Sequence, residues 1–144
     1  LLPLFFVRFG FKNTILVGMI AWVIRYLLFA YGNVGDRTSM LILGILIHGI
    51  CYDFFFVSGQ IYTDFKAGEK VKSAAQGLIT LATYGIGMLI GFWIAGKISD
   101  AFILESGKHD WRMIWKFPAL FAMGVFILFL IIFKNEKINY KNQS

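Results

Sequence analysis

Four long apolar runs dominate the sequence and constrain its fold more than any other feature. They cover residues 14–31, 40–62, 74–96 and 113–133. Each is close to the roughly 20 predominantly apolar residues that an α-helix needs to cross a bilayer. A helix satisfies its backbone hydrogen bonds internally, which a chain in hydrocarbon must do. The sequence therefore predicts an all-α integral membrane protein with four transmembrane helices.

The composition indicates that the solvent around these runs is lipid. Hydrophobic residues make up 58% of the chain and charged residues only 15%, whereas soluble domains carry about a quarter of their residues as charged ones. A water-soluble domain of this size could not bury so much apolar surface. The net charge is +6, but the basic residues lie in short breaks between apolar runs. This pattern predicts contact with a bilayer and excludes a nucleic-acid-binding surface.

The two ends of the chain differ from the four runs. Residues 1–7 are apolar but too few to span a membrane, and residues 8–13 have turn chemistry. We interpret residues 1–13 as the end of a preceding transmembrane helix and a cytoplasmic loop, so we expect the chain to be a fragment that lacks earlier helices. Residues 134–144 are polar and are predicted to form a cytoplasmic tail.

The basic residues suggest an orientation in the membrane. If the first break is cytoplasmic, eight basic residues lie in the inner segments and five in the outer ones. The inner ones are Arg8, Lys12, Lys66, Lys70, Lys72, Lys134, Lys137 and Lys141, and the outer ones are Arg37, Lys97, Lys108, Arg112 and Lys116. Cytoplasmic segments are enriched in Lys and Arg, so this orientation is preferred.

Asp53 is the most informative polar residue. It lies thirteen residues after Met40 and nine before Tyr62, near the middle of its span. Ionisable side chains at this depth usually face a bundle interior or an aqueous path, where they mark a substrate or proton pathway. Gln60 follows seven residues later on the same helical stripe. The alternative is a hydrogen bond from Asp53 to a neighbouring helix. We favour a functional role because a buried carboxylate without a partner is costly.

Other polar residues within the spans have two interpretations each. Arg25 and His48 lie at similar depth on the outer side of Asp53. Arg25 either takes part in function or braces its helix, and His48 either relays a proton or bonds a backbone carbonyl. An uncharged polar stripe in the third run either lines a pathway or bonds a neighbouring helix. It consists of Gln76, Thr80, Thr83 and Gly87.

Enzymatic chemistry has little support. The chain has no hydrolase, metalloprotease or phosphate-binding motif and no paired carboxylates at useful spacing. We therefore predict no catalytic residues, no cofactor and no metal. A membrane enzyme that uses His48 and Asp53 is a remote alternative.

Several short segments resemble one family of transporters. They are RFGFKN at 8–13, AWVIRY at 21–26, CYDFF at 51–55 and SAAQG at 73–77. The first is similar to a degenerate loop motif of the major facilitator superfamily. The other three resemble the ninth, tenth and eleventh helices of its nucleoside:proton symporters, the bacterial nucleoside permease group. Trp111 and Trp115 lie where the twelfth helix of that family begins.

The resemblance implies twelve helices in two six-helix bundles with the substrate between them. The chain would supply the last four helices and the end of the eighth, in a cell inner membrane. Asp53 matches the substrate-binding aspartate of the family, and Tyr52 an aromatic residue that lies against the nucleoside. The chain departs from the family at Phe56, Val57 and His48, where we expect other residue types.

We therefore predict the C-terminal part of a nucleoside symporter that works by alternating access. Its partners are the nucleoside, a proton, the lipid bilayer and the missing N-terminal helices. Asp53 and Tyr52 are predicted to bind substrate. Five further residues are candidates for the pathway or for coupling: Gln60, Gln76, Thr80, His48 and Arg25. The alternatives are a facilitator for another polar solute, such as a sugar or drug, and a four-helix membrane scaffold that transports nothing.

Overall fold

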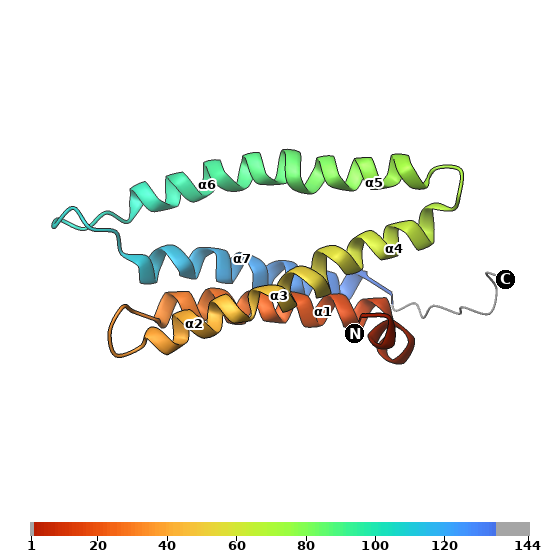
Figure 1. Cartoon of the computed structure of the whole chain (residues 1–144). Coiled ribbons are helices and arrows are strands. Elements are labelled where there is room, and N and C mark those ends of the chain that lie inside the picture. The colour runs from red at the N-terminus through yellow and green to blue at the C-terminus, as the bar shows by residue number, and fades with distance from the viewer. Residues whose placement is uncertain (1, 135–144) are drawn as a thin grey trace.

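The computed structural model describes residues 2–134, and almost all of these are helical. The helices run back and forth as long rods joined by short turns (Figure 1). Four stretches are long and apolar enough to cross a membrane: Leu4–Tyr31, Thr38–Ala67, Lys72–Ala101 and Trp111–Ile132. The predicted all-α fold with four membrane-spanning helices is confirmed.

Two of the spans are built from several helical segments. The first is α1 (Leu2–Tyr31) and the fourth is α7 (Trp111–Ile132). The second consists of α2 (Thr38–Leu46), α3 (His48–Cys51), the π-helical segment η1 (Tyr52–Val57) and α4 (Ser58–Ala67). The third consists of α5 (Lys72–Thr80), the π-helical segment η2 (Leu81–Gly87) and α6 (Met88–Ala101). The second and third spans extend past the predicted runs because polar residues at their ends continue the helix.

Helix α1 contains a sharp kink at Gly10. Its backbone has φ 79° and ψ 169°, a left-handed conformation that favours glycine. The hydroxyl of Thr14 is buried and donates to the Gly10 carbonyl oxygen one turn earlier at 2.8 Å, which ties the helix to the kink. The chain is helical on both sides of Gly10, so residues 8–13 form a kink where the sequence suggested a loop.

Different loops and helix ends lie at the two ends of the bundle. The loop before α2 and the loop before α7 lie at one end, and the kink of α1, the turn before α5 and the end of α7 lie at the other (Figure 1). At this second end the ammonium group of Lys12 donates to the Leu130 carbonyl oxygen at 2.6 Å. A cation at the C-terminal end of a helix is favourable because it meets unpaired carbonyl groups. The predicted inner segments within residues 2–134 thus share one end. Of the predicted tail, all but Lys134 lies outside the described residues.

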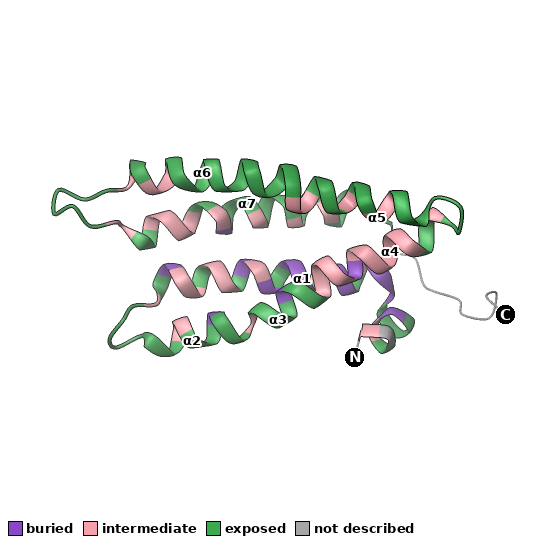
Figure 2. Ribbon diagram, turned by 45° about the horizontal axis from the view of Figure 1, so that its top comes forward, coloured by how far each residue is buried: buried purple, intermediate pink, exposed green. Residues whose placement is uncertain are grey.

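Helix α1 is the centre of the packing. Most of the buried side chains belong to it, and it appears as the most purple rod in Figure 2. The third span, in contrast, has no buried residue within its described length and is green over most of its surface. Apolar side chains exposed to this extent suit a surface that lipid or further protein covers.

A very close contact between spans occurs where α1 crosses η1 at Gly18. A Cβ atom at this position would lie 2.7 Å from the Phe54 carbonyl carbon and 2.7 Å from the Phe55 nitrogen. The backbones therefore touch, which only glycine permits here. The Phe54 ring also packs edge-on against Phe5, with 5.0 Å between the ring centroids. These contacts fix the depth of η1 along α1.

Candidate functional site

Both middle spans leave α-helical geometry halfway across the membrane. Segment η1 begins one residue before Asp53, which lies fifteen residues past Thr38 and fourteen before Ala67. Segment η2 interrupts the third span in the same way. The π-helix is rare and occurs mostly as short insertions at functional sites, because its wider turn displaces side chains from their α-helical positions. The two insertions therefore mark a candidate site near the midplane.

Asp53 presents a free carboxylate at this depth. The residue is exposed in the structure, and within residues 2–134 its carboxylate has no hydrogen-bonding or ionic partner. Its backbone is held instead: the buried Ser58 hydroxyl donates to the Asp53 carbonyl oxygen at 3.2 Å. A fixed backbone with an unpaired carboxylate is suited to accept hydrogen bonds from the hydroxyl groups of a ligand.

Tyr52 links η1 to η2 through its side chain. Its hydroxyl oxygen lies 3.0 Å from that of Tyr84, and both rings approach Phe56. The ring centroids of Tyr52 and Phe56 are 5.6 Å apart, and those of Phe56 and Tyr84 are 5.8 Å apart. These three rings, which we call the bridging cluster, connect the two π-helical segments beside Asp53.

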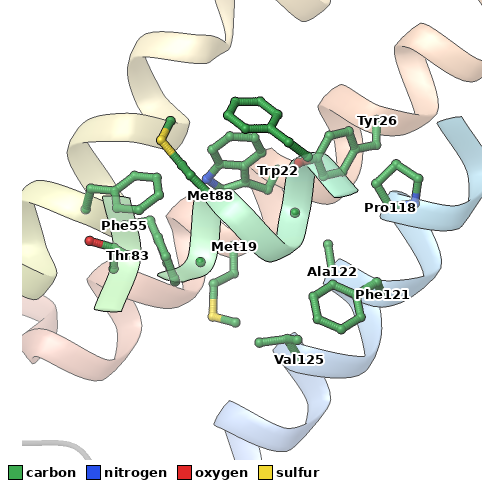
Figure 3. A pocket seen from close by; sticks show the side chains of 14 residues that line it. Met19, Trp22, Tyr26, Phe55, Thr83, Met88, Pro118, Phe121, Ala122 and Val125 are labelled. Carbon is green, nitrogen blue, oxygen red and sulfur yellow. The ribbon is translucent and has the colours of Figure 1, made fainter. Parts of the chain in front are cut away.

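A groove of about 570 Å³ lies next to the bridging cluster, a volume within the usual range for small-molecule sites. Its walls come from α1, η1, η2, α6 and α7 (Figure 3). The lining is mostly apolar and consists of Met19, Trp22, Tyr26, Phe55, Phe56, Thr83, Gly87, Met88, Gly91, Phe92, Pro118, Phe121, Ala122 and Val125. Asp53 and Tyr52 are not part of the lining, but the Tyr52 ring contacts Phe56, which is.

Arg25 lies among aromatic rings. Its guanidinium carbon is 5.2 Å from the Trp22 ring centroid and 5.1 Å from that of Phe29, so it makes cation–π contacts with both. Trp115 of α7 stacks on Tyr26 and also packs against Phe29. The Nε atom of Arg25 is buried without a hydrogen-bond partner in the described residues. Arg25 thus contacts two rings of its own helix, and one of them, Phe29, packs against Trp115 of α7.

His48 stands apart from the carboxylate. Its ring meets Trp22 edge-on at 6.2 Å between centroids, and its side chain is exposed. Both His48 and Arg25 therefore contact Trp22, as their similar depth suggested. No hydrogen bond joins either of them to Asp53 within residues 2–134, so the structure shows no proton relay among the three.

Gln60 and Gln76 lie at the end of the bundle where α4 turns into α5. The Gln76 amide donates to Asp64 Oδ1 at 2.6 Å and to the Gln60 carbonyl oxygen at 2.8 Å. Lys72 Nζ lies 3.4 Å from Asp64 Oδ2. We call this set the turn clamp. It uses both donors of the Gln76 amide, so only the Oε1 oxygen of Gln76 is left to accept a bond from a substrate.

Replacement of Asp64 by Asn tests the turn clamp. The change removes the ion pair with Lys72 and weakens the bond to Gln76, so we expect a loss of about 1 kcal/mol in the stability of this turn. Trypsin should then cleave the turn between α4 and α5 faster than in the wild type. Glu69→Gln is the matched control because it removes a charge from the same turn without touching the clamp. Equal cleavage rates in the two variants would contradict the role given to Asp64.

The structure thus divides the predicted candidates into separate groups. Asp53 and Tyr52 lie together in η1, Arg25 and His48 meet at Trp22, and Gln60 and Gln76 belong to the turn clamp. Thr80 is exposed at the end of α5, where its carbonyl oxygen accepts a bond from the Thr83 hydroxyl at 3.4 Å.

Tyr84 and Asp64 were not predicted from the sequence. Tyr84 lies four residues after Thr80, and Asp64 lies four residues after Gln60. Residues four apart share a helical face, so both continue polar stripes that contain predicted candidates. Extension of the Gln60 stripe by one turn would have found Asp64, and Tyr84 lies within the stripe from Gln76 to Gly87, next to Thr83.

Four membrane-length helices, with two π-helical insertions and a free carboxylate at mid-span, define a multi-pass membrane protein with a candidate site inside the membrane. The model of the nucleoside H⁺ symporter family matches residues 1–138, and the chain belongs to this family.

Similar proteins are found among transporters of Escherichia coli K12. The chain is 37% identical over 142 residues to the putative nucleoside transporter YegT. This alignment covers 94% of this chain and 33% of YegT. It is 32% identical over 145 residues to the xanthosine permease, and this alignment covers 97% of this chain and 34% of the permease. The crystal structure of the nucleoside transporter NupG superposes with a TM-score of 0.84 at 29% identity and covers 94% of this chain and 33% of that one. The chain thus spans about one third of the length of these relatives.

These comparisons confirm two predictions. The family that the sequence motifs resemble is the one to which the chain belongs. The predicted location in the cell inner membrane is confirmed by this membership and by the four spans.

Proposed function

We propose that the chain supplies the C-terminal four membrane helices of a proton-coupled nucleoside symporter. The observation that carries this proposal is the free carboxylate of Asp53, held at mid-span in η1 beside the ring of Tyr52. Membership of the nucleoside H⁺ symporter family supports the substrate class and the coupling ion. The two remaining partners are the surrounding lipid and the earlier helices of the carrier.

Asp53 and Tyr52 have complementary parts in nucleoside binding. Ribose hydroxyl groups donate hydrogen bonds, and the Asp53 carboxylate offers two acceptor oxygens. Hydrogen bonds to an ionised acceptor are stronger than bonds between neutral groups, which suits a site that must replace the water around the substrate hydroxyls. The Tyr52 ring gives the planar base an aromatic surface. Neither step changes a covalent bond, so the proposed activity is transport without catalysis.

Coupling follows if the carrier changes sides only when it is empty or fully loaded. In the loaded state the nucleoside is bound at Asp53 and Tyr52 while a proton is held at the same time, and rocking of one half of the carrier against the other then moves both across the membrane. Arg25 and His48 lie on Trp22 rather than on Asp53, so they are placed to brace this half. Gln60, Gln76 and Thr80 lie towards the other end of the bundle and are placed to influence opening there.

Uptake of labelled uridine by proteoliposomes that contain the complete gene product tests this function. With an inward acid gradient, we expect accumulation to increase about tenfold for each pH unit at one proton per nucleoside, because one unit corresponds to about 1.4 kcal/mol. A protonophore should abolish accumulation while leaving equilibration intact. Equal accumulation with and without the gradient would contradict symport. Absence of uridine and xanthosine uptake would contradict nucleoside transport altogether.

A further inference from the structure

The two π-helical segments are joined across a gap. No Cα atom of η1 lies within 8 Å of one in η2, so their backbones do not pack against each other. The bridging cluster of Tyr52, Phe56 and Tyr84 is what reaches across, through one hydroxyl–hydroxyl bond of 3.0 Å and the contact of two rings. These side chains join η1 directly to η2, whereas the turn clamp joins the neighbouring helices α4 and α5.

The hydroxyl bond acts on the residue next to Asp53. Tyr52 precedes Asp53 directly, so a contact that holds Tyr52 acts on the same turn of η1 that carries the carboxylate. The opposite side of η1 is fixed at Gly18 and by the packing of Phe54 on Phe5. Tyr84 is thus the described contact that holds the open side of η1, where Tyr52 and Asp53 are exposed.

We propose that Tyr84 is a positioning residue of the nucleoside site: its hydroxyl orients Tyr52 and thereby sets the geometry of Tyr52 and Asp53 for substrate binding. This inference rests on the proposed function. Tyr84 itself lies in η2, whose wider turn places a tyrosine at mid-span and towards η1. A neutral bond between two hydroxyl groups is weak enough to break and re-form when the third span moves in the transport cycle.

Tyr84→Phe in the complete gene product tests this role, because it keeps the ring on Phe56 and removes only the hydroxyl. Interhelical hydrogen bonds in membranes correspond to a change of about threefold on average and about twentyfold at most. We expect the KM for uridine to rise within that range while the maximal rate per molecule changes less than about twofold. Tyr52→Phe should give a similar rise, and the double variant should be no worse than the poorer single variant. Tyr62→Phe is the matched control because it removes a hydroxyl from the span that carries Tyr52, outside the bridging cluster.

The outcomes separate this inference from the function on which it rests. Absence of uridine uptake by the wild type would contradict nucleoside transport itself. Normal wild-type uptake with an unchanged KM in Tyr84→Phe would overturn only the positioning role. That role is also overturned if the two single effects on KM simply add, or if the maximal rate falls while KM is unchanged. A raised KM with non-additive effects supports the proposal.

Discussion

Uridine uptake by the complete gene product should fall sharply when Asp53 is replaced by Asn. The two side chains have nearly the same shape, but Asn carries no charge and offers one acceptor oxygen instead of two. A hydrogen bond to a charged group contributes about 1.5–3 kcal/mol, which corresponds to a roughly tenfold to hundredfold rise in the KM for uridine. The measurement is initial uptake over a range of uridine concentrations, normalised to the amount of protein in the membrane.

The same variant separates binding from coupling. Asn cannot take up a proton, so residual uptake should no longer respond to an inward acid gradient if Asp53 also participates in coupling. A variant with a raised KM that still responds to the gradient would assign the proton to another residue. Asp36→Asn is the matched control, because Asp36 is an exposed residue of the turn before α2. This turn lies at the end of the second span, far from η1. Uptake that is unchanged in Asp53→Asn would contradict the site assignment.

Hydropathy was sufficient to predict the spans and the depth of Asp53, because both depend on the length of apolar runs and on a constant rise per residue. The kink at Gly10 was less predictable. The turn chemistry of residues 8–13 indicated a break, but a single left-handed glycine completes the change of direction and the helix continues on both sides. Whether a break becomes a loop or a kink depends on packing, and here Phe6 and Phe11 are buried on either side of Gly10.

The π-helical segments could not be predicted from local sequence. Their hydrogen-bond pattern differs from that of an α-helix by one residue, and tertiary contacts decide between the two. The stripes predicted with α-helical periodicity were affected accordingly. Gln76 and Thr83 lie on opposite sides of the start of η2, and only Thr83 lines the groove. Gln76 belongs to the turn clamp, because its partner Asp64 lies twelve residues earlier on the other arm of the turn.

The contact between Tyr52 and Tyr84 also lies beyond sequence patterns. The residues are 32 positions apart, and their approach depends on how the second and third spans are placed on α1. What places the second span is the crossing at Gly18. A methyl group there would lie within 3.0 Å of three backbone atoms of η1: the carbonyl carbon and oxygen of Phe54 and the nitrogen of Phe55. Backbone atoms cannot rotate away as a side chain can, so the two segments must separate.

Gly18→Ala should therefore destabilise the protein by about 1–3 kcal/mol, the usual cost of overpacking a close contact. Part of this cost is offset, because Ala is favoured over Gly in a helix by up to about 1 kcal/mol. Gly124→Ala on α7 is the control, since it makes the same helix-favouring change at a position with no heavy atom within 4 Å. The apparent melting temperature of the purified protein, followed by tryptophan fluorescence, should be lower for Gly18→Ala than for Gly124→Ala.

Displacement of η1 should also change the positions of the two proposed substrate-binding residues. Asp53 and Tyr52 are part of the segment that Gly18 holds, so protein that remains folded in Gly18→Ala should bind uridine more weakly than the Gly124→Ala control. Larger side chains at residue 18 should increase both effects, because each added carbon pushes η1 farther from α1. If Gly18→Ala proves as stable and as active as Gly124→Ala, then the close crossing does not fix η1, and the position of Asp53 must depend on other contacts.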